Sequence, residues 1–344
     1  MNKMDQNHNE HLADLLDQID ATNSVQEVKG KSIAEPIEVG CFEVRTINDW
    51  IQLALTKPMP DDLWGGYGMF LENEVTCLFS DSGVGKTILA VQIGEGIAKR
   101  GKNVLYVDYE LSDTQFTRRY VNNGYIHRFP ETFYRCEQSS RLWLDNNGGD
   151  PLDEVIQVIN NIGADAVIID NLSWISEDAE EGDVATLLMR RLCLLKRTHE
   201  MTIIVIAHTP KRIMDNPITQ NDLGGSKKLM NFMDSAVAIG RVNGDDTRRY
   251  IKHVKCRTGE NKHGSENVLV CRKEMGDEAF LKFVVEGTAR ERDLLKSSDD
   301  VRVEELVMAM DANGATQSEI ASQLRCSQSK VSKMLKKIRN NVEY

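Results

Sequence analysis

The chain has 344 residues, of which 41% are hydrophobic, enough for one large domain with a buried core and a small accessory domain. A formal net charge of -11 excludes a protein that coats nucleic acid indiscriminately, so a DNA site would need a local concentration of basic residues. No apolar run approaches the roughly 20 residues of a membrane helix. We therefore expect no membrane contact. The seven cysteines are scattered and lack paired metal spacing, so we expect reduced thiols in a cytoplasmic protein.

Strand-like and helix-like segments alternate through the middle of the chain. Before them, we expect residues 1–40 to form a disordered or loosely structured acidic arm. The expected strands are Glu74–Ser80, Asn103–Glu110, Asp165–Asn171 and Thr202–His208, and the expected helices are Lys86–Arg100, Asp113–Asn123, Leu152–Ile162 and Asp183–Glu200. Nearly continuous Val, Ile and Leu strands that alternate with helices indicate an α/β fold, with a mostly parallel central sheet covered on both faces.

The pattern changes after residue 225. Short strand-like runs separated by turn residues predict antiparallel strands added to one sheet edge. These runs are Ser235–Val242, Arg249–Arg257, Asn267–Lys273 and Phe280–Val285. A polar linker follows at residues 287–300, and residues 301–344 have the pattern of a small all-α domain. We therefore expect the α/β domain to span residues 41–286.

The segment Ser80-Asp81-Ser82-Gly83-Val84-Gly85-Lys86-Thr87 has the composition of a phosphate-binding loop. Such a loop needs small residues whose backbone N–H groups can face the phosphates, and a helix N-terminus behind them. It also needs a lysine for the β- and γ-phosphate oxygens and a hydroxyl for Mg²⁺. Lys86 and Thr87 fill these last two roles. Ser80 stands where such loops usually have their first glycine, and the alternative interpretation is a chance glycine-rich turn.

Acidic residues at the ends of neighbouring strands are candidates for the remaining chemistry. Asp170 ends a buried strand and is the expected second holder of Mg²⁺. Hydrolysis also needs a carboxylate that orients and polarises the attacking water. We favour Glu110 for this role; Asp108 competes with it, and a helix-capping or solvent-facing acid is the alternative. His208 ends another strand and either reports the presence of a γ-phosphate or is a core histidine.

With these residues in place, the chain resembles the RecA-like ATPases, and among them the RepA-type plasmid replicative helicases and the DnaB-type hexameric helicases. The resemblance covers residues 63–285. It rests on Tyr109-Glu110-Leu111-Ser112 with Gln115-Phe116 and Arg119, Ile169-Asp170-Asn171-Leu172, Val205-Ile206-Ala207-His208-Thr209, Asp222-Leu223-Gly224-Gly225-Ser226 and Met233-Asp234-Ser235. It implies a RecA-like P-loop NTPase fold, ATP and Mg²⁺ as ligands, and ATP hydrolysis.

The segment Lys255-Cys256-Arg257-Thr258-Gly259 resembles the K-x-R-x-G pattern of the DnaB-type enzymes. In that family the lysine and the arginine reach the γ-phosphate held by a neighbouring subunit. The resemblance therefore implies that Lys255 and Arg257 act in trans and that the protein is a homo-oligomer, a hexameric ring. The alternative is a solvated basic strand edge.

Residues of both charge signs could line the channel of such a ring. Lys211, Arg212, Lys227 and Lys228 could neutralise DNA phosphates. The acidic loop Glu177–Asp183 would repel DNA if it lined the same channel. The sequence thus supports an ATPase better than a helicase.

The end of the chain resembles a bacterial helix-turn-helix module that binds DNA. Thr316 and Glu319 form a capping-box pattern, and Ser327 can cap the last helix. Residues 325–341 contain six basic residues and no acidic one. The expected DNA-binding residues are Gln328, Ser329, Ser332 and Lys333 at base edges, Lys336, Lys337 and Arg339 at phosphates, and Lys330. The alternatives are a structural helical cap and a protein-docking module.

Together these features favour an ATP-hydrolysing, helicase-like ring protein that acts on DNA in replication, recombination or mobilisation of a plasmid or other mobile element. One alternative is a nucleotide-gated DNA-binding regulator, and another is a defence or signalling ATPase whose tail binds protein. ATP turnover stimulated by single-stranded DNA favours the motor. Slow turnover with nucleotide-dependent binding of one duplex site favours the regulator, and a lack of DNA affinity favours the third hypothesis.

Overall fold

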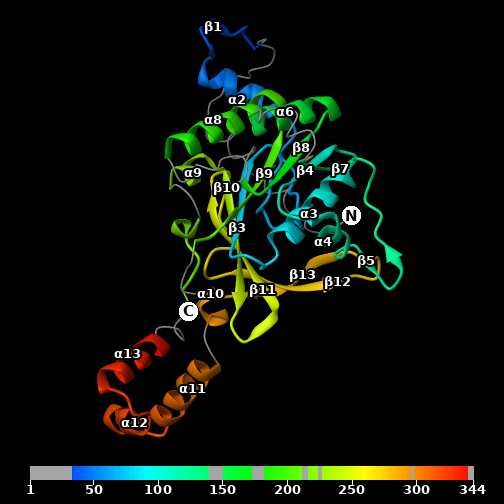
Figure 1. Ribbon diagram of the computed structural model, residues 1–344. Helices are drawn as coiled ribbons and strands as arrows, with labels where there is room; N and C mark the ends of the chain where they lie inside the picture. The colour runs from blue at the N-terminus through cyan, green and yellow to red at the C-terminus, as the bar shows by residue number, and fades with distance from the viewer. Residues whose placement is uncertain are drawn as a thin grey trace. The chain divides into compact units, whose positions relative to one another are not determined.

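The structure is a computed structural model that describes residues 33–138, 150–172, 182–210, 216–223, 227–295 and 298–339 (Figure 1). The chain divides into two units, residues 1–59 and residues 60–344. The described part of the first unit contains the hairpin of β1 (Ile37–Val39) and β2 (Phe42–Val44), followed by helix α2 (Ile47–Leu55). None of the residues in these three elements is buried, so this part has no hydrophobic core of its own.

The second unit is built on a nine-stranded sheet with the order β13-β12-β11-β10-β3-β9-β8-β4-β7. The strands are β3 (Val75–Ser80), β4 (Val104–Asp108), β7 (Phe133–Glu137), β8 (Ala166–Asp170), β9 (Thr202–His208), β10 (Ser235–Val242), β11 (Asp245–Cys256), β12 (Val268–Met275) and β13 (Leu281–Ala289). The strands from β10 to β7 are parallel, and β11, β12 and β13 extend the sheet in antiparallel order. The mostly parallel α/β sheet expected from the sequence is confirmed.

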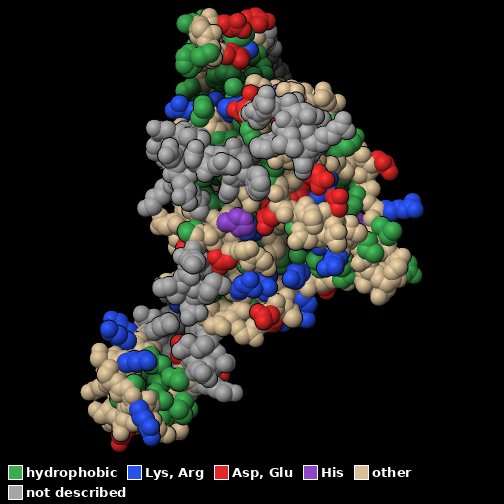
Figure 2. All heavy atoms as spheres, in the orientation of Figure 1, with side chains coloured by type: hydrophobic (Ala, Val, Ile, Leu, Met, Phe, Trp, Pro, Cys, Tyr) green, Lys and Arg blue, Asp and Glu red, His purple; other side chains and the backbone are tan. Residues whose placement is uncertain are grey.

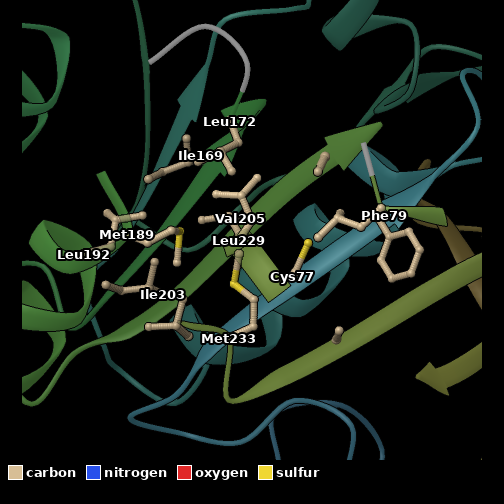
Figure 3. Close-up of a cluster of buried hydrophobic side chains, with 14 of the residues drawn as sticks. Cys77, Phe79, Ile169, Leu172, Met189, Leu192, Ile203, Val205, Leu229 and Met233 are labelled. Atoms are coloured by element: carbon tan, nitrogen blue, oxygen red, sulfur yellow. The ribbon is translucent and has the colours of Figure 1, made fainter. Parts of the chain in front are cut away.

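Helices cover both faces of this sheet because its central strands are apolar on both sides (Figure 1). Helix α3 (Lys86–Ala98) packs on one face, and α6 (Pro151–Ile162), α8 (Gly182–His199) and α9 (Lys227–Phe232) pack on the other. Figure 3 shows the second interface, where side chains of β3, β8 and β9 meet Met189 and Leu192 of α8 and Leu229 of α9. The two packed faces fix the sheet, and hence the loops at its carboxyl edge.

Three local expectations were wrong. The helix expected at 113–123 ends early, as α4 (Asp113–Thr117), and a hairpin of β5 (Val121–Asn122) and β6 (Tyr125–Ile126) follows. Asn123 and Gly124 have φ of 50° and 83°, a left-handed pair that forms a two-residue hairpin turn. Strand β7 was not expected. Strand β10 was expected to join the sheet in antiparallel order; it pairs antiparallel with β11 but parallel with β3.

The segments after β13 are helical. β13 continues to Ala289, three residues past the expected domain end, and α10 (Glu291–Leu294) follows it. The helices α11 (Ser298–Ala312), α12 (Gln317–Gln323) and α13 (Gln328–Arg339) share a small core that includes Val307, Ile320, Val331 and Leu335. The described helices include none that is long and apolar enough to cross a membrane.

Candidate functional site

The loop at residues 80–87 connects β3 to α3 at the carboxyl edge of the sheet. Gly83 and Gly85 have φ of 71° and 125°, conformations that favour glycine. A Cβ on Gly85 would also lie 2.7 Å from the ring of Phe283. Ser80, by contrast, is the last residue of β3 and is absent from the positive-φ residues. Serine at this position therefore costs the loop nothing in backbone conformation.

Lys86 is buried, and its ammonium group lies inside the loop. Its Nζ donates to the carbonyl oxygens of Ser80 at 3.0 Å and Asp81 at 3.1 Å, and lies 3.1 Å from Nδ1 of His208. Burial lowers the pKa of Lys86. A buried cation held by neutral acceptors is poised to gain from phosphate oxygens placed beside it.

Asp170 ends β8 beside Thr87, the second residue of α3. Its Oδ2 accepts hydrogen bonds from Thr87 Oγ1 at 2.7 Å and from the hydroxyl of Tyr106 at 2.8 Å. Its Oδ1 is buried and has no hydrogen-bond partner among the described residues. Burial is the main cause that raises the pKa of Asp170 to about 6. Because a buried oxygen left without a donor is costly, this pair of oxygen-bearing side chains fits a Mg²⁺ ion, which prefers oxygen ligands.

Glu110 lies at the same edge, beyond the end of β4. Its Oε2 lies 3.7 Å from Nε2 of His208 and 3.5 Å from Nδ2 of Asn171. Contact with His208 is the largest cause that lowers the pKa of Glu110. The Glu110 carboxylate is thus ionised, and its side chain is 38% exposed, so water can reach it.

Both oxygens of the competing carboxylate, Asp108, already accept hydrogen bonds. Its Oδ1 accepts from the backbone N–H groups of Glu110 at 3.1 Å and Leu111 at 2.9 Å, and its Oδ2 accepts from Arg135 Nε at 3.0 Å. Asp108 is 2% exposed. It shapes the turn that presents Glu110 and has little capacity left to bind a water molecule.

The residues that sequence reasoning missed here are Tyr106 and Asn171. Asn171 directly follows Asp170, so its position at the sheet edge was a usable signal. Tyr106 lies inside β4 opposite Ile168 of β8. Its contact with Asp170 depends on which strands are neighbours, which the sequence does not show.

Lys255 and Arg257 do not join the site of their own chain. Ala236 of β10 pairs with Lys255 on one side and with Cys77 of β3 on the other. Lys255 therefore lies at the height of Cys77, near the start of β3. The side chains of Lys255 and Arg257 donate to the backbone carbonyls of Met230 and Asn231. At about 3.3 Å of rise per residue, the two lie some 10–16 Å of strand away from the phosphate loop.

The structure describes the DNA-binding candidates only in part. Lys211, Arg212 and most of the acidic loop lie outside the described residues, as do the side chains of Lys227, Lys228, Lys337 and Arg339. In α13, Val331 and Leu335 are buried in the helical core. The exposed residues of α13 include Gln328, Ser329, Lys330, Ser332, Lys333 and Lys336.

Residues 43–214, half of the chain, match the AAA domain family AAA_25. The chain belongs to this family. Membership agrees with the P-loop and the sheet described above, and it confirms the expected RecA-like P-loop ATPase fold.

Curated relatives and a solved structure were also found. The chain is 26% identical over 201 residues to DNA repair protein RadA of Chlamydia pneumoniae, a match that covers 56% of this chain and 38% of that protein. The RadA of Chlamydia trachomatis is 25% identical over the same length. The chain thus spans under two fifths of these relatives. A KaiC-like protein from Pyrococcus horikoshii OT3 is 17% identical, with a TM-score of 0.44, over 62% of this chain and 91% of that one.

Proposed function

We propose that the protein binds ATP with Mg²⁺ at residues 80–87 and hydrolyses it in an activity coupled to DNA. The observation that carries this proposal is a convergence at one sheet edge. Lys86 after β3, Asp170 at the end of β8 and Glu110 after β4 surround one phosphate loop, with His208 between Lys86 and Glu110. Ligands of open α/β sheets bind at this edge.

Each side chain has a role in hydrolysis that its position supports. Lys86 holds the β- and γ-phosphate oxygens, and Glu110 orients the attacking water and takes its proton as the oxygen bonds to the γ-phosphorus and the bond to the β-phosphate oxygen breaks. Thr87 and Asp170 would hold the Mg²⁺ ion, which neutralises charge on the phosphates. His208 contacts both Lys86 and Glu110, so it can sense whether a γ-phosphate is present.

The trans role of Lys255 and Arg257 belongs to the same proposal. The strand registers place both residues away from the phosphate loop of their own chain, and this separation supports a role in trans. A neighbouring subunit could present them to the γ-phosphate, as in the family that the motif resembles. We therefore propose a homo-oligomeric ring, a hexamer, whose sites lie between subunits.

The DNA role rests on the helical unit at the end of the chain and on the relatives. An exposed row of polar and basic residues on α13, from Gln328 to Lys336, is suited to a DNA groove. The RadA relatives are named as DNA repair proteins. We propose that α13 binds DNA and that the ATPase serves recombination, replication or mobilisation of a mobile element.

The test is ATP turnover by wild type and by Lys86→Ala, with no DNA, single-stranded DNA and duplex DNA. Lys262→Ala, which removes an exposed lysine in the loop after β11, is the matched control. The proposal expects DNA to stimulate wild type and Lys262→Ala, and Lys86→Ala to be inactive. Slow turnover that no DNA stimulates, with nucleotide-dependent binding of one duplex site, would favour the regulator instead. Absent turnover in wild type under all conditions would refute the ATPase.

A further inference from the structure

The antiparallel strands β11 and β12 carry cations on both faces of the sheet. On one face the cations are neutralised. Arg248 and Arg272 share the carboxylate of Glu286, with Nε to oxygen distances of 2.8 Å and 2.6 Å. Exposed pairs of this kind contribute little to stability, but they remove the repulsion between like charges.

On the opposite face, three cations are close together without a carboxylate between them. Arg241 of β10 pairs directly with Arg249 of β11, and Lys273 of β12 lies two residues past Cys271, the partner of Arg249. This face also carries Ile239, Ile251 and Cys271 of the core under α3. Within the described ranges, no ion pair links Arg241, Arg249 or Lys273 to an acid.

A fourth cation, Arg119, comes from the turn after α4. Its Nη1 is buried and makes no hydrogen bond to a described residue. Burial lowers the pKa of Lys273, and the charges of Arg249, Arg119 and Arg241 lower it further. Burial and the charge of Arg241 also lower the pKa of Arg249, while Asp245 and Asp246 raise it without forming an ion pair with it. Like charges opposite each other on a sheet are destabilising, so this cluster costs stability while no anion is near.

The cluster touches the phosphate loop. Arg241 Nη2 donates to the carbonyl oxygen of Ser82 at 3.4 Å, and Arg249 Nε donates to that of Val84 at 3.3 Å. Since β10 borders β3 on the side away from β9, β8 and β4, the cluster flanks the loop opposite Glu110. Figure 2 shows Lys and Arg side chains gathered over this β11–β13 side of the molecule.

We propose that Arg119, Arg241, Arg249 and Lys273 form a second phosphate subsite beside the loop, which binds the phosphate chain of the nucleotide at its nucleoside end. This subsite rests on the proposed nucleotide binding. It would also fix the direction in which the phosphate chain of the nucleotide lies in the loop. The γ-phosphate faces Lys86 and Glu110 on one flank, and the cluster holds the other end of the chain. Guanidinium and ammonium groups are suited to phosphate oxygens.

The test compares Lys273→Gln and Arg241→Gln with Arg272→Gln, which removes the neighbouring cation on the neutralised face. Dissociation constants for ATP with Mg²⁺ and for inorganic tripolyphosphate are measured by calorimetry, together with the melting temperature of each free protein. We expect Lys273→Gln and Arg241→Gln to weaken binding of both ligands about tenfold, and Arg272→Gln to change it less than twofold. The free Lys273→Gln protein should melt no lower than wild type, because a repulsion has been removed.

Equal affinities in Lys273→Gln and Arg272→Gln would overturn the subsite, as would a Lys273→Gln protein that binds weakly only because it melts well below wild type. If wild type binds no ATP, the proposed function fails. Tripolyphosphate still decides the subsite in that case: its binding must weaken in Lys273→Gln and Arg241→Gln and not in Arg272→Gln.

Discussion

Asp170 presents two carboxylate oxygens in unequal surroundings. Thr87 and Tyr106 donate to Oδ2, whereas Oδ1 is buried without a partner in the described part of the chain. Tyr106 is itself fully buried, and its hydroxyl donates to Asp170 and makes no hydrogen bond to a described residue of the phosphate loop. We therefore propose that Tyr106 is a positioning residue, which holds the Asp170 carboxylate and leaves Oδ1 available to a Mg²⁺ ion.

The substitution Tyr106→Phe tests this positioning role, because it removes only the hydroxyl that donates to Asp170. A hydrogen bond to a charged acceptor is worth about 1.5–3 kcal/mol, so the Mg²⁺ concentration for half-maximal turnover should rise about tenfold. Turnover at saturating Mg²⁺ should fall much less, because Lys86 and Glu110 are unchanged. Tyr134→Phe, at an exposed position of β7, is the control. An unchanged Mg²⁺ titration in Tyr106→Phe would show that Asp170 does not need this donor.

Among the elements, the central strands were the most predictable. Ala166–Ile169 is a continuous apolar run and Val75–Phe79 is interrupted only by Thr76, because both faces of β3 and β8 are buried. The loop between β3 and α3 was expected from its small residues, its lysine and hydroxyl, and the helix behind it. The hairpin of β5 and β6 and the edge strand β7 carry weaker patterns, since they are exposed or half-buried. Their place was decided by the turn at Asn123-Gly124 and by pairing with β4, which no local pattern reveals.

Strand β11 carries a buried histidine that makes stability depend on pH. His253 is 1% exposed, and its Nε2 lies 2.8 Å from Ser235 Oγ. Burial, with a smaller effect of His263, lowers its pKa from 6.5 to about 4. Between pH 6.5 and pH 4 this histidine is protonated in the unfolded chain but not in the folded chain. The free energy of unfolding therefore falls as pH falls through this range.

Replacing His253→Gln should remove that dependence. Between pH 7 and pH 5, the free energy of unfolding of wild type should fall by about 2 kcal/mol more than that of the variant. Urea unfolding at the two pH values measures the difference. His199→Gln changes the exposed last residue of α8 and should behave like wild type. Parallel losses in wild type and His253→Gln would show that this histidine is not responsible.

At the scale of the whole molecule, two residues of the proposed site lie far from the phosphate loop of their own chain. Lys255 and Arg257 lie towards the amino-terminal ends of the parallel strands, and the phosphate loop lies at the carboxyl ends. The proposed ring, in which each chain presents Arg257 to its neighbour, would resolve this separation. The sequence motif suggested the trans role, and the separation given by the strand registers supports that proposal.

Mixing two inactive variants tests the ring. Lys86→Ala lacks a working loop but keeps Arg257, and Arg257→Ala keeps the loop but lacks the arginine. Each alone should be nearly inactive, since a trans arginine contributes about 10³–10⁵ in rate. Mixed rings should regain turnover at interfaces where an intact loop meets an intact arginine. No recovery after verified subunit exchange would argue against shared sites.

We propose that the protein hydrolyses ATP at the phosphate loop, with Glu110 as the general base. The most direct measurement is the rate of phosphate release by wild type and by Glu110→Gln, with ATP binding measured on the same samples and Glu131→Gln, at an exposed position before β7, as the control. This role of Glu110 predicts that Glu110→Gln binds ATP as wild type does but releases phosphate about 10²–10⁴ times more slowly. Wild-type release rates in Glu110→Gln would contradict it.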